Sequence, residues 1–227
     1  IPFILSGPST PIKKSQYLTF YRLLVVGSQF KRENFSTHEK RVILLAKTLS
    51  ALYLDALDNR DIFSNDRNHI FLQNKIYNIL AGGYNEELTE EIISNVFANF
   101  ERFAKNLIQR YNQNSGTLEF KSISFSNALP SASMQKVEIL AEETHNKDMG
   151  PCKLILTDGT KVVYKPRSML AEKIVCRFFS ECEEKIHNLY PQFLREEKKI
   201  LGTYAILDKG DYGYCELLEN KREENVL

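Results

Sequence analysis

The sequence carries no excess of charge of either sign, no paired cysteine motif and no long uninterrupted apolar run. Its 30 Lys and Arg residues face 29 Asp and Glu, which leaves a formal net charge of +1. A chain with so little net charge has no strong positive electrostatic potential that would attract nucleic acid or an anionic membrane. The best apolar stretch, VILLAKTLSALYLDAL, is interrupted by Lys47 and Asp55 and is amphipathic, so we expect a soluble protein with no membrane span.

The four cysteines lie at long or irregular intervals, at Cys152, Cys176, Cys182 and Cys215. None of these intervals matches the paired spacing of a zinc site or of a thioredoxin-type motif. Free cysteine behaves as a small apolar side chain, so we interpret all four as buried reduced thiols and assign no metal ligand. Reduced thiols indicate a cytoplasmic protein.

Residues 1–116 show the apolar periodicity of helices and predict an all-helical subdomain. Helices are expected at about 14–30, 36–59, 66–82 and 86–112. Ser36 and Glu39 form a capping box at the second of them, and Asp66 is the expected cap of the third. The fourth helix carries apolar residues at helical spacing that we interpret as core: Ile92, Val96, Phe100, Phe103, Leu107 and Tyr111.

From residue 117 the pattern changes to short β segments, expected at 117–125, 134–143, 152–156, 161–165, 201–207 and 212–218. Between the third and fourth segments, Asp158 and Gly159 form a strong hairpin signal. An amphipathic helix is expected at 170–187. The sequence therefore predicts an α+β fold, with an all-helical subdomain at 1–116 and an antiparallel-sheet lobe with one packed helix at 117–227.

Lys165 ends the strand segment KVVYK and is followed by the expected helix. A kinase-like N-lobe needs this order, because a rigid strand aims the ammonium at nucleotide phosphates and an acidic residue on the next helix steadies it. Arg167, two residues further on, can hold phosphate through its planar guanidinium. The sequence does not choose among four acidic partners on the helix: Glu172, Glu181, Glu183 and Glu184.

Three motifs, in one order, resemble class II (LanM-type) lanthipeptide synthetases. The segment VVYKPRSM around Lys165 is similar to the family's VYKPRSL signature, and YGYCELLE is similar to its YGWVEFV segment. The segment ETH, which contains Glu143 and His145, is similar to an Asp-x-His element. The helical segment NVFANFERFAKNLIQRY also resembles the family, so the similarity runs from about residue 70 to the end and points to the ATP-binding lobe of the dehydratase.

This resemblance implies a lipid-kinase-like fold and a two-stage reaction in a bacterial cytoplasm. ATP and Mg²⁺ would phosphorylate Ser or Thr of a precursor peptide, and elimination of the phosphate would then give dehydro-amino acids. His145 and Glu143 would serve the phosphate or elimination chemistry, and Lys165 would contact the nucleotide phosphates. The implied cofactor-binding residues, which include a hinge strand whose backbone meets adenine, are Lys165, Arg167, Glu172, Glu181, Tyr214, Glu216 and Leu217.

Two features depart from the family pattern. Glu143 replaces the family's Asp, and Lys147 and Asp148 stand where a glycine pair normally follows the histidine. Glycines let backbone N–H groups approach phosphate closely, so their loss bears on elimination more than on nucleotide binding. Two alternatives stay open: an atypical protein or lipid kinase without elimination, and a non-catalytic pseudokinase or adaptor module.

Kinase chemistry also needs a catalytic loop and a magnesium-binding segment after the hinge strand. No Asp-x-His-x-x-Asn string occurs in the 227 residues. We therefore expect the magnesium ligands and the C-lobe to lie beyond this chain, as parts of a longer protein, and we expect this part alone to be inactive.

Overall fold

The computed structural model describes residues 35–82, 86–117, 119–120, 132–140, 150–189 and 203–218. The chain divides into two compact units, Ile1–Arg102 and Phe103–Leu227. The division falls inside helix α5 (Glu86–Asn114), whereas the sequence placed the change of domain after residue 116. The last turns of α5 belong with the second unit because Phe103 and Tyr111 contact its aromatic residues. The helix expected at 14–30 lies outside the described residues.

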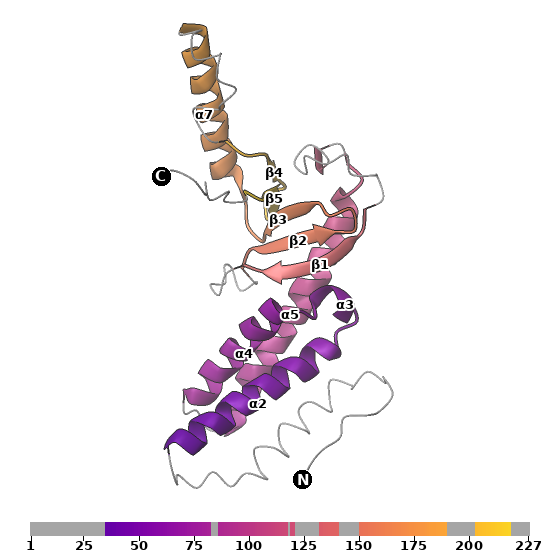
Figure 1. The fold of residues 1–227 in the computed structure, drawn as a ribbon, viewed down its shortest axis with the longest axis vertical. Coiled ribbons are helices and arrows are strands. Elements are labelled where there is room, and N and C mark those ends of the chain that lie inside the picture. The colour runs from indigo at the N-terminus through magenta and orange to yellow at the C-terminus, as the bar shows by residue number, and fades with distance from the viewer. Residues whose placement is uncertain are drawn as a thin grey trace, which may run out of the picture. The chain divides into compact units, whose positions relative to one another are not determined.

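In the first unit, α2 (Phe35–Asp55) packs against α4 (Asp66–Ala81), and the short helix α3 (Arg60–Phe63) lies between them in the chain (Figure 1). Tyr53 on α2 stacks on Phe97 of α5, with ring centroids 4.1 Å apart. The Tyr53 hydroxyl also donates a hydrogen bond of 2.6 Å to the Phe97 carbonyl. Phe100 meets Tyr53 and Phe63 edge to face. Aromatic contacts therefore connect α2, α3 and α5 within the core of this unit.

The helices expected at 36–59, 66–82 and 86–112 are confirmed, with differences at their ends. Helix α2 ends at Asp55 and not near residue 59, and Ser36, the expected cap, already lies within it. Asn65, and not Asp66, caps α4, because its backbone is extended and its side chain accepts a hydrogen bond of 3.2 Å from the Asn68 N–H. Asp66 is instead the first helical residue, where a carboxylate meets the positive end of the helix. The helix α3 was not predicted, because a single turn is too short to give a periodic signal.

The second unit contains a five-stranded antiparallel sheet in the order β1-β2-β3-β5-β4 (Figure 1). Helix α7 (Leu170–Leu189) follows β3 in the chain. The strands are β1 (Met134–Ile139), β2 (Cys152–Leu156), β3 (Lys161–Lys165), β4 (Ile206–Asp208) and β5 (Gly213–Glu216). The predicted α+β fold, with helices first and an antiparallel sheet after them, is therefore confirmed.

Two turns show how well local signals predicted this unit. The β2–β3 hairpin turns at Asp158 and Gly159 as expected, and Gly159 has a φ of +83° that a side chain would strain. The β segment expected at 117–125 is wrong at Glu119 and Phe120, which are helical. The Thr117 hydroxyl accepts a hydrogen bond of 3.2 Å from the Phe120 N–H and so favours a turn over a strand. Residues 118 and 121–125 lie outside the described part.

One face of the sheet is buried and aromatic. Tyr164 on β3 and Tyr214 on β5 are cross-strand neighbours with ring centroids 5.4 Å apart. Phe103 contacts Tyr164, and Phe120 contacts Tyr214. From α5, the Arg110 guanidinium donates a hydrogen bond of 2.6 Å to the Tyr164 hydroxyl. This face therefore forms the core of the second unit.

The opposite face of the sheet carries lysines. Strand pairing places Glu138, Lys153, Val163 and Cys215 in one row across β1, β2, β3 and β5. Side chains alternate along a strand, so Lys165, two residues after Val163, lies on the same face and is paired with Gly213. We call this surface the lysine face, and define it by Glu138, Lys153, Val163, Lys165, Gly213 and Cys215.

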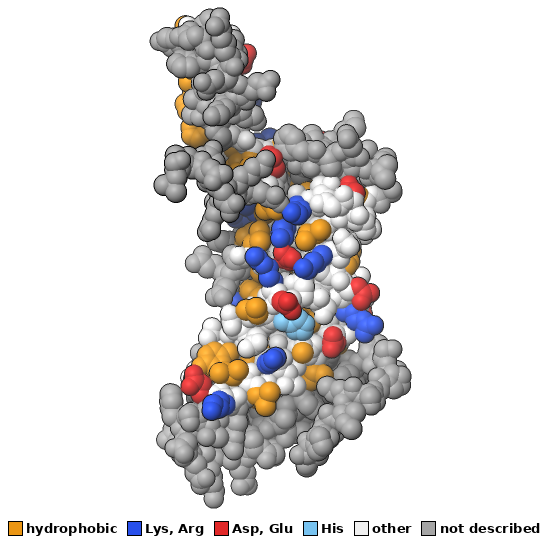
Figure 2. Space-filling view, in the orientation of Figure 1, with side chains coloured by type: hydrophobic (Ala, Val, Ile, Leu, Met, Phe, Trp, Pro, Cys, Tyr) orange, Lys and Arg blue, Asp and Glu red, His pale blue; other side chains and the backbone are white. Residues whose placement is uncertain are grey.

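Helix α7 packs against β4 but is exposed over most of its length. Figure 2 shows apolar side chains on this helix at the top of the view, and acidic and basic side chains interspersed over the described atoms below. The large apolar residues that α7 exposes are Leu170, Ile174, Val175, Phe178, Phe179 and Leu189. None of the helices within the described ranges combines the length and the apolar content needed to cross a membrane.

Candidate functional site

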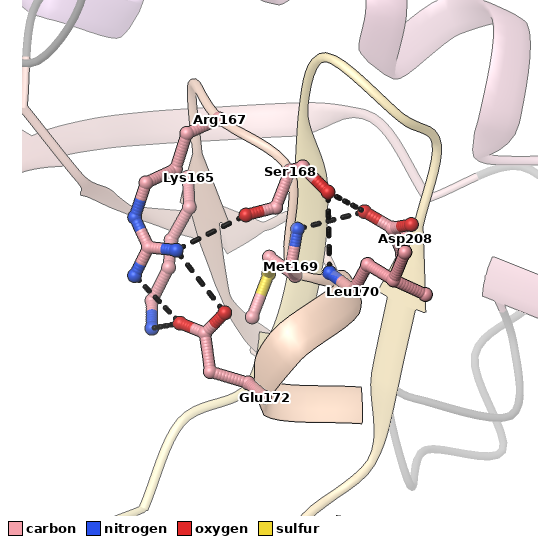
Figure 3. Close-up of polar contacts among 7 residues, drawn as sticks. All are labelled: Lys165, Arg167, Ser168, Met169, Leu170, Glu172 and Asp208. Atoms are coloured by element: carbon pink, nitrogen blue, oxygen red, sulfur yellow. Dashed lines mark hydrogen bonds and ion pairs between the residues drawn. The ribbon is translucent and has the colours of Figure 1, made fainter. Parts of the chain in front are cut away.

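A lysine–glutamate ion pair joins the end of β3 to the start of α7. Lys165 is the last residue of β3, and Glu172 lies in the first turn of α7. The Lys165 Nζ donates a hydrogen bond of 3.2 Å to Glu172 Oε1, as Figure 3 shows. Of the four acidic residues that the sequence left open, Glu172 is the one that the structure brings to Lys165. Glu181 instead pairs with Arg177, one turn earlier on α7, at 2.8 Å.

Arg167 shares the same carboxylate. Its two terminal nitrogens reach both oxygens of Glu172, at 2.6 Å to Oε1 and 3.1 Å to Oε2, and one of them also donates to the Ser168 carbonyl at 3.0 Å (Figure 3). The hydrogen bonds from Arg167 and then from Lys165 outweigh the effect of burial and lower the pKa of Glu172 to about 2. The three groups together carry a charge of +1, so the cluster can accept an anion.

The start of α7 is held in place by β4. Asp208 Oδ1 accepts hydrogen bonds from the Met169 N–H at 2.7 Å and from the Ser168 hydroxyl at 3.2 Å. The same hydroxyl accepts a hydrogen bond of 3.2 Å from the Leu170 N–H (Figure 3). These bonds satisfy backbone donors at the helix start and fix the turn from which Glu172 extends. The geometry of the Lys165–Glu172 pair therefore depends on a residue about forty positions later in the chain.

A small apolar cluster lies beside the ion pair. Val163, Met169 and Cys215 form its buried centre, and Tyr204, Ile206 and Leu217 pack against them. Val163 and Cys215 belong to the lysine face, so an apolar surface lies next to the cationic end of β3. Burial raises the pKa of the Cys215 thiol to about 11, so this cysteine is a packing residue and not a nucleophile.

The structure separates the hinge-strand residues that the sequence grouped together. Tyr214 is fully buried on the aromatic face, and burial raises the pKa of its hydroxyl far above the usual value. Within the described residues that hydroxyl has no hydrogen-bond partner. By strand alternation Glu216 shares the side of Tyr214, whereas Leu217 packs with the apolar cluster of the lysine face. Only the backbone of Tyr214 is thus available to a ligand. Cys215, which the sequence predicted only as a buried thiol, lies on the lysine face.

The remaining predicted site residues, His145 and Glu143, lie outside the described residues. Lys165 and Arg167 can hold a phosphate group, since both are partly exposed cations at the end of β3. Among the residues that the structure describes, no group of three His, Cys, Asp or Glu side chains could hold a metal ion. Sequence reasoning missed Asp208 and Met169 because both act across long separations in the chain.

Comparison with protein families places most of the second unit in a known family model. A family model with the description "Domain of unknown function (DUF4135)" matches residues 88–226. The match covers more than half of the chain and includes α7 and the described strands of the sheet. A comparison with curated proteins gives no significant match.

Proposed function

The chain belongs to the DUF4135 family over residues 88–226, and we propose that this region is the nucleotide-binding lobe of an ATP-dependent phosphotransferase. The observation that carries the proposal is the ion pair between Lys165 at the end of β3 and Glu172 in the first turn of α7. In protein kinases a strand lysine and a helix glutamate form such a pair, and the lysine contacts nucleotide phosphates. The order of strand, lysine, helix and glutamate is the same here.

The surroundings of the pair support a nucleotide as the ligand. Lys165 supplies a compact cation that can contact bridging phosphate oxygens, and Glu172 holds the ammonium toward the lysine face. Arg167 supplies a planar donor that suits a phosphate oxygen pair. At the edge of the apolar cluster, the partly buried side chains of Tyr204, Ile206 and Leu217 offer an apolar surface for the adenine ring. A cationic end next to an apolar surface is the arrangement that a nucleoside phosphate requires.

The finer proposal concerns the reaction. We propose a LanM-like lanthipeptide dehydratase, in which ATP and Mg²⁺ phosphorylate Ser or Thr of a precursor peptide before the phosphate is eliminated. Its support is that the ion pair falls in VVYKPRSM and the strand β5 in YGYCELLE, the two segments with the strongest resemblance to that family. The roles of His145 and Glu143 in elimination stay predictions, and so does the position of the magnesium ligands beyond this chain.

Nucleotide binding tests the lobe assignment directly. Isothermal titration of the chain with ATP and Mg²⁺ should show binding, and Lys165→Met and Glu172→Gln should weaken it by about tenfold or more, because each removes a charge-assisted contact or its support. Glu181→Gln is the matched control, since Glu181 lies on the same helix in an exposed ion pair. A wild-type chain that binds no nucleotide, or a control variant as weak as Glu172→Gln, would contradict the assignment.

Mass spectrometry of a Ser/Thr-rich peptide separates the possible reactions. The peptide is incubated with ATP, Mg²⁺ and the longer protein that contains this chain, with the Lys165→Met variant beside it. Loss of one water per modified residue supports the dehydratase. A stable phosphate adduct supports an atypical kinase, for which the missing glycine pair after His145 is the motivating observation. An unchanged peptide together with intact nucleotide binding supports a pseudokinase.

A further inference from the structure

A second carboxylate on the lysine face also holds two cations. Glu138 on β1 accepts a hydrogen bond of 2.6 Å from Lys136 and another of 2.6 Å from Lys153. Burial of Glu138 opposes ionisation, but the two lysine hydrogen bonds outweigh it and lower the pKa of the carboxyl to about 2. The group of Lys136, Glu138 and Lys153 therefore repeats the arrangement of Lys165, Glu172 and Arg167: one carboxylate, two cations and a net charge of +1.

Strand register places the second group close to the first. Lys153 on β2 is directly opposite Val163 on β3, and Lys165 lies two residues beyond Val163. Lys153 and Lys165 are thus diagonal neighbours on one face, a separation of roughly 7–8 Å in a sheet, which long side chains can span. Val163, a member of the apolar cluster, lies beside both lysines. Both ammonium groups can therefore reach a ligand that spans β2 and β3 on the lysine face.

The two lysines that share Glu138 differ in position. Lys153 is on an inner strand with 20% of its side chain exposed, whereas Lys136 is on the outer strand β1 with 41% exposed. The Glu138 side chain itself is only 10% exposed. A buried ion pair adds little to stability compared with an apolar pair of similar volume, so stability alone does not explain three charges at this place. If Glu138 positions Lys153, this role explains why Glu138 is buried and why the lysine lies on an inner strand.

We propose that Lys153 is a second phosphate-contacting residue of the nucleotide site and that Glu138 is the residue that positions it. This inference rests on the proposed function and deepens it, because it assigns the polyphosphate to two lysines from neighbouring strands. Lys165 and Lys153 share the negative charge of the phosphates, and Glu138 fixes the position of the Lys153 ammonium through their 2.6 Å contact. The site then distinguishes ligands by the number of their phosphates.

Titration with three probes tests this inference: ATP with Mg²⁺, adenosine, and inorganic tripolyphosphate. Lys153→Met should weaken ATP binding by about tenfold and leave adenosine binding unchanged, because a charged hydrogen bond to phosphate is lost. Lys136→Met is the matched control, as it removes the other partner of Glu138, and should change ATP binding by less than about threefold. Glu138→Gln should weaken ATP binding, and Glu138→Asp should restore part of the loss, which a lysine of purely structural role would not show.

The outcomes separate this inference from the proposed function. If Lys165→Met loses ATP binding but Lys153→Met does not, the inference is wrong and the nucleotide-binding lobe stands. Equal losses in Lys136→Met and Lys153→Met also overturn it, since they indicate a structural cluster. If the wild-type chain binds no ATP, the proposed function fails. Tripolyphosphate binding that depends on Lys153 would then still support an anion site at these lysines. If tripolyphosphate does not bind either, the anion site is also overturned.

Discussion

A methyl group at Gly213 would lie 2.9 Å from the sulfur of Met169 and 2.8 Å from the carbonyl oxygen of Leu207. Met169 is fully buried and immediately precedes α7, and Gly213 is paired with Lys165 across β3 and β5. The backbone oxygen cannot move without disturbing the β4–β5 pair. The glycine therefore lets three elements converge beside the ion pair.

Gly213→Ala should accordingly destabilise the second unit by about 1–3 kcal/mol, the usual cost of overpacking a closed site. It should also weaken nucleotide binding, because displacement of Met169 shifts the start of α7 and with it Glu172. Thermal unfolding followed by circular dichroism suits a chain without tryptophan. Gly116→Ala is the control, since no atom lies within 4 Å of its added methyl group; equal effects of the two changes would contradict the packing argument.

Arg110 should not tolerate replacement by lysine. Its guanidinium donates to the Tyr164 hydroxyl at 2.6 Å and to Asp211 at 2.5 Å, and lies 4.4 Å from the centre of the Tyr212 ring. A lysine cannot make these three contacts together, because it lacks the planar fork. Arg110→Lys should cost about 1–3 kcal/mol in the free energy of unfolding.

The control for Arg110 is on the same helix. Arg102 donates a hydrogen bond of 2.8 Å to the Asn99 side chain at the surface, so Arg102→Lys should change stability by less than about 0.5 kcal/mol. Urea unfolding measures both variants. A loss as small in Arg110→Lys as in Arg102→Lys would show that the network around Tyr164 is not important for stability.

Tyr53→Phe tests the first unit. The change removes the hydrogen bond from the Tyr53 hydroxyl to the Phe97 carbonyl and keeps the stacked rings. A cost of about 1 kcal/mol is expected, because a buried hydrogen bond is lost while packing is retained. Tyr77→Phe on α4, whose residue is only partly buried, should be nearly neutral in the same thermal unfolding assay. An unchanged midpoint for Tyr53→Phe would show that stacking alone joins α2 to α5.

Stability should fall in acid because of two carboxylates. The pKa values of Glu138 and Glu172 are lowered to about 2 from an ordinary value of 4.5. A group whose pKa is lower in the folded state stabilises the fold above its unfolded pKa and loses that contribution as the pH falls through its folded pKa. Each carboxylate should therefore contribute to the free energy of unfolding above about pH 5, and this contribution should disappear toward pH 2. The expected loss per group is on the order of 2 kcal/mol.

Urea unfolding at several pH values measures this loss. The double variant with Glu138→Gln and Glu172→Gln should have a lower stability at pH 7 and a shallower decline between about pH 5 and pH 2. The Glu181→Gln variant should keep the wild-type slope. If the double variant declines as steeply as the wild type, other carboxylates control the acid response.

Local signals in the sequence predicted most of the fold. The turn at Gly159 and the apolar spacing of α5 depend on residues close in the chain. The turn agrees with the structure. On α5 the expected Phe100, Phe103, Leu107 and Tyr111 are buried, but Ile93 and Phe97 are buried in place of the expected Ile92 and Val96. The predicted strand is wrong at residues 119–120, because the hydrogen bond from the Phe120 N–H to the Thr117 hydroxyl favours a helical turn despite their β-like composition. A single sequence does not show which of two competing local conformations, strand or helical turn, is the more stable.

The candidate site was predictable only in part. Lys165 and Arg167 followed from their order before a helix, but the choice of Glu172 required the geometry of the first turn of α7. Glu138 and Lys153 meet because of strand register, which no spacing in the sequence specifies. Alternation along YGYCELL, by contrast, could have separated Tyr214 from Cys215, because adjacent strand residues face opposite sides.

Helix α5 has a consequence for how this domain could be reused in evolution. The family region begins at residue 88, near the start of α5, yet the packing boundary falls after Arg102. The inherited segment thus includes Ile93, Phe97 and Phe100, which are buried in the first unit. Any protein that acquires this segment must also supply an apolar cover for those residues. Changes in the covering helices should therefore be tolerated only where they keep an apolar surface over those residues.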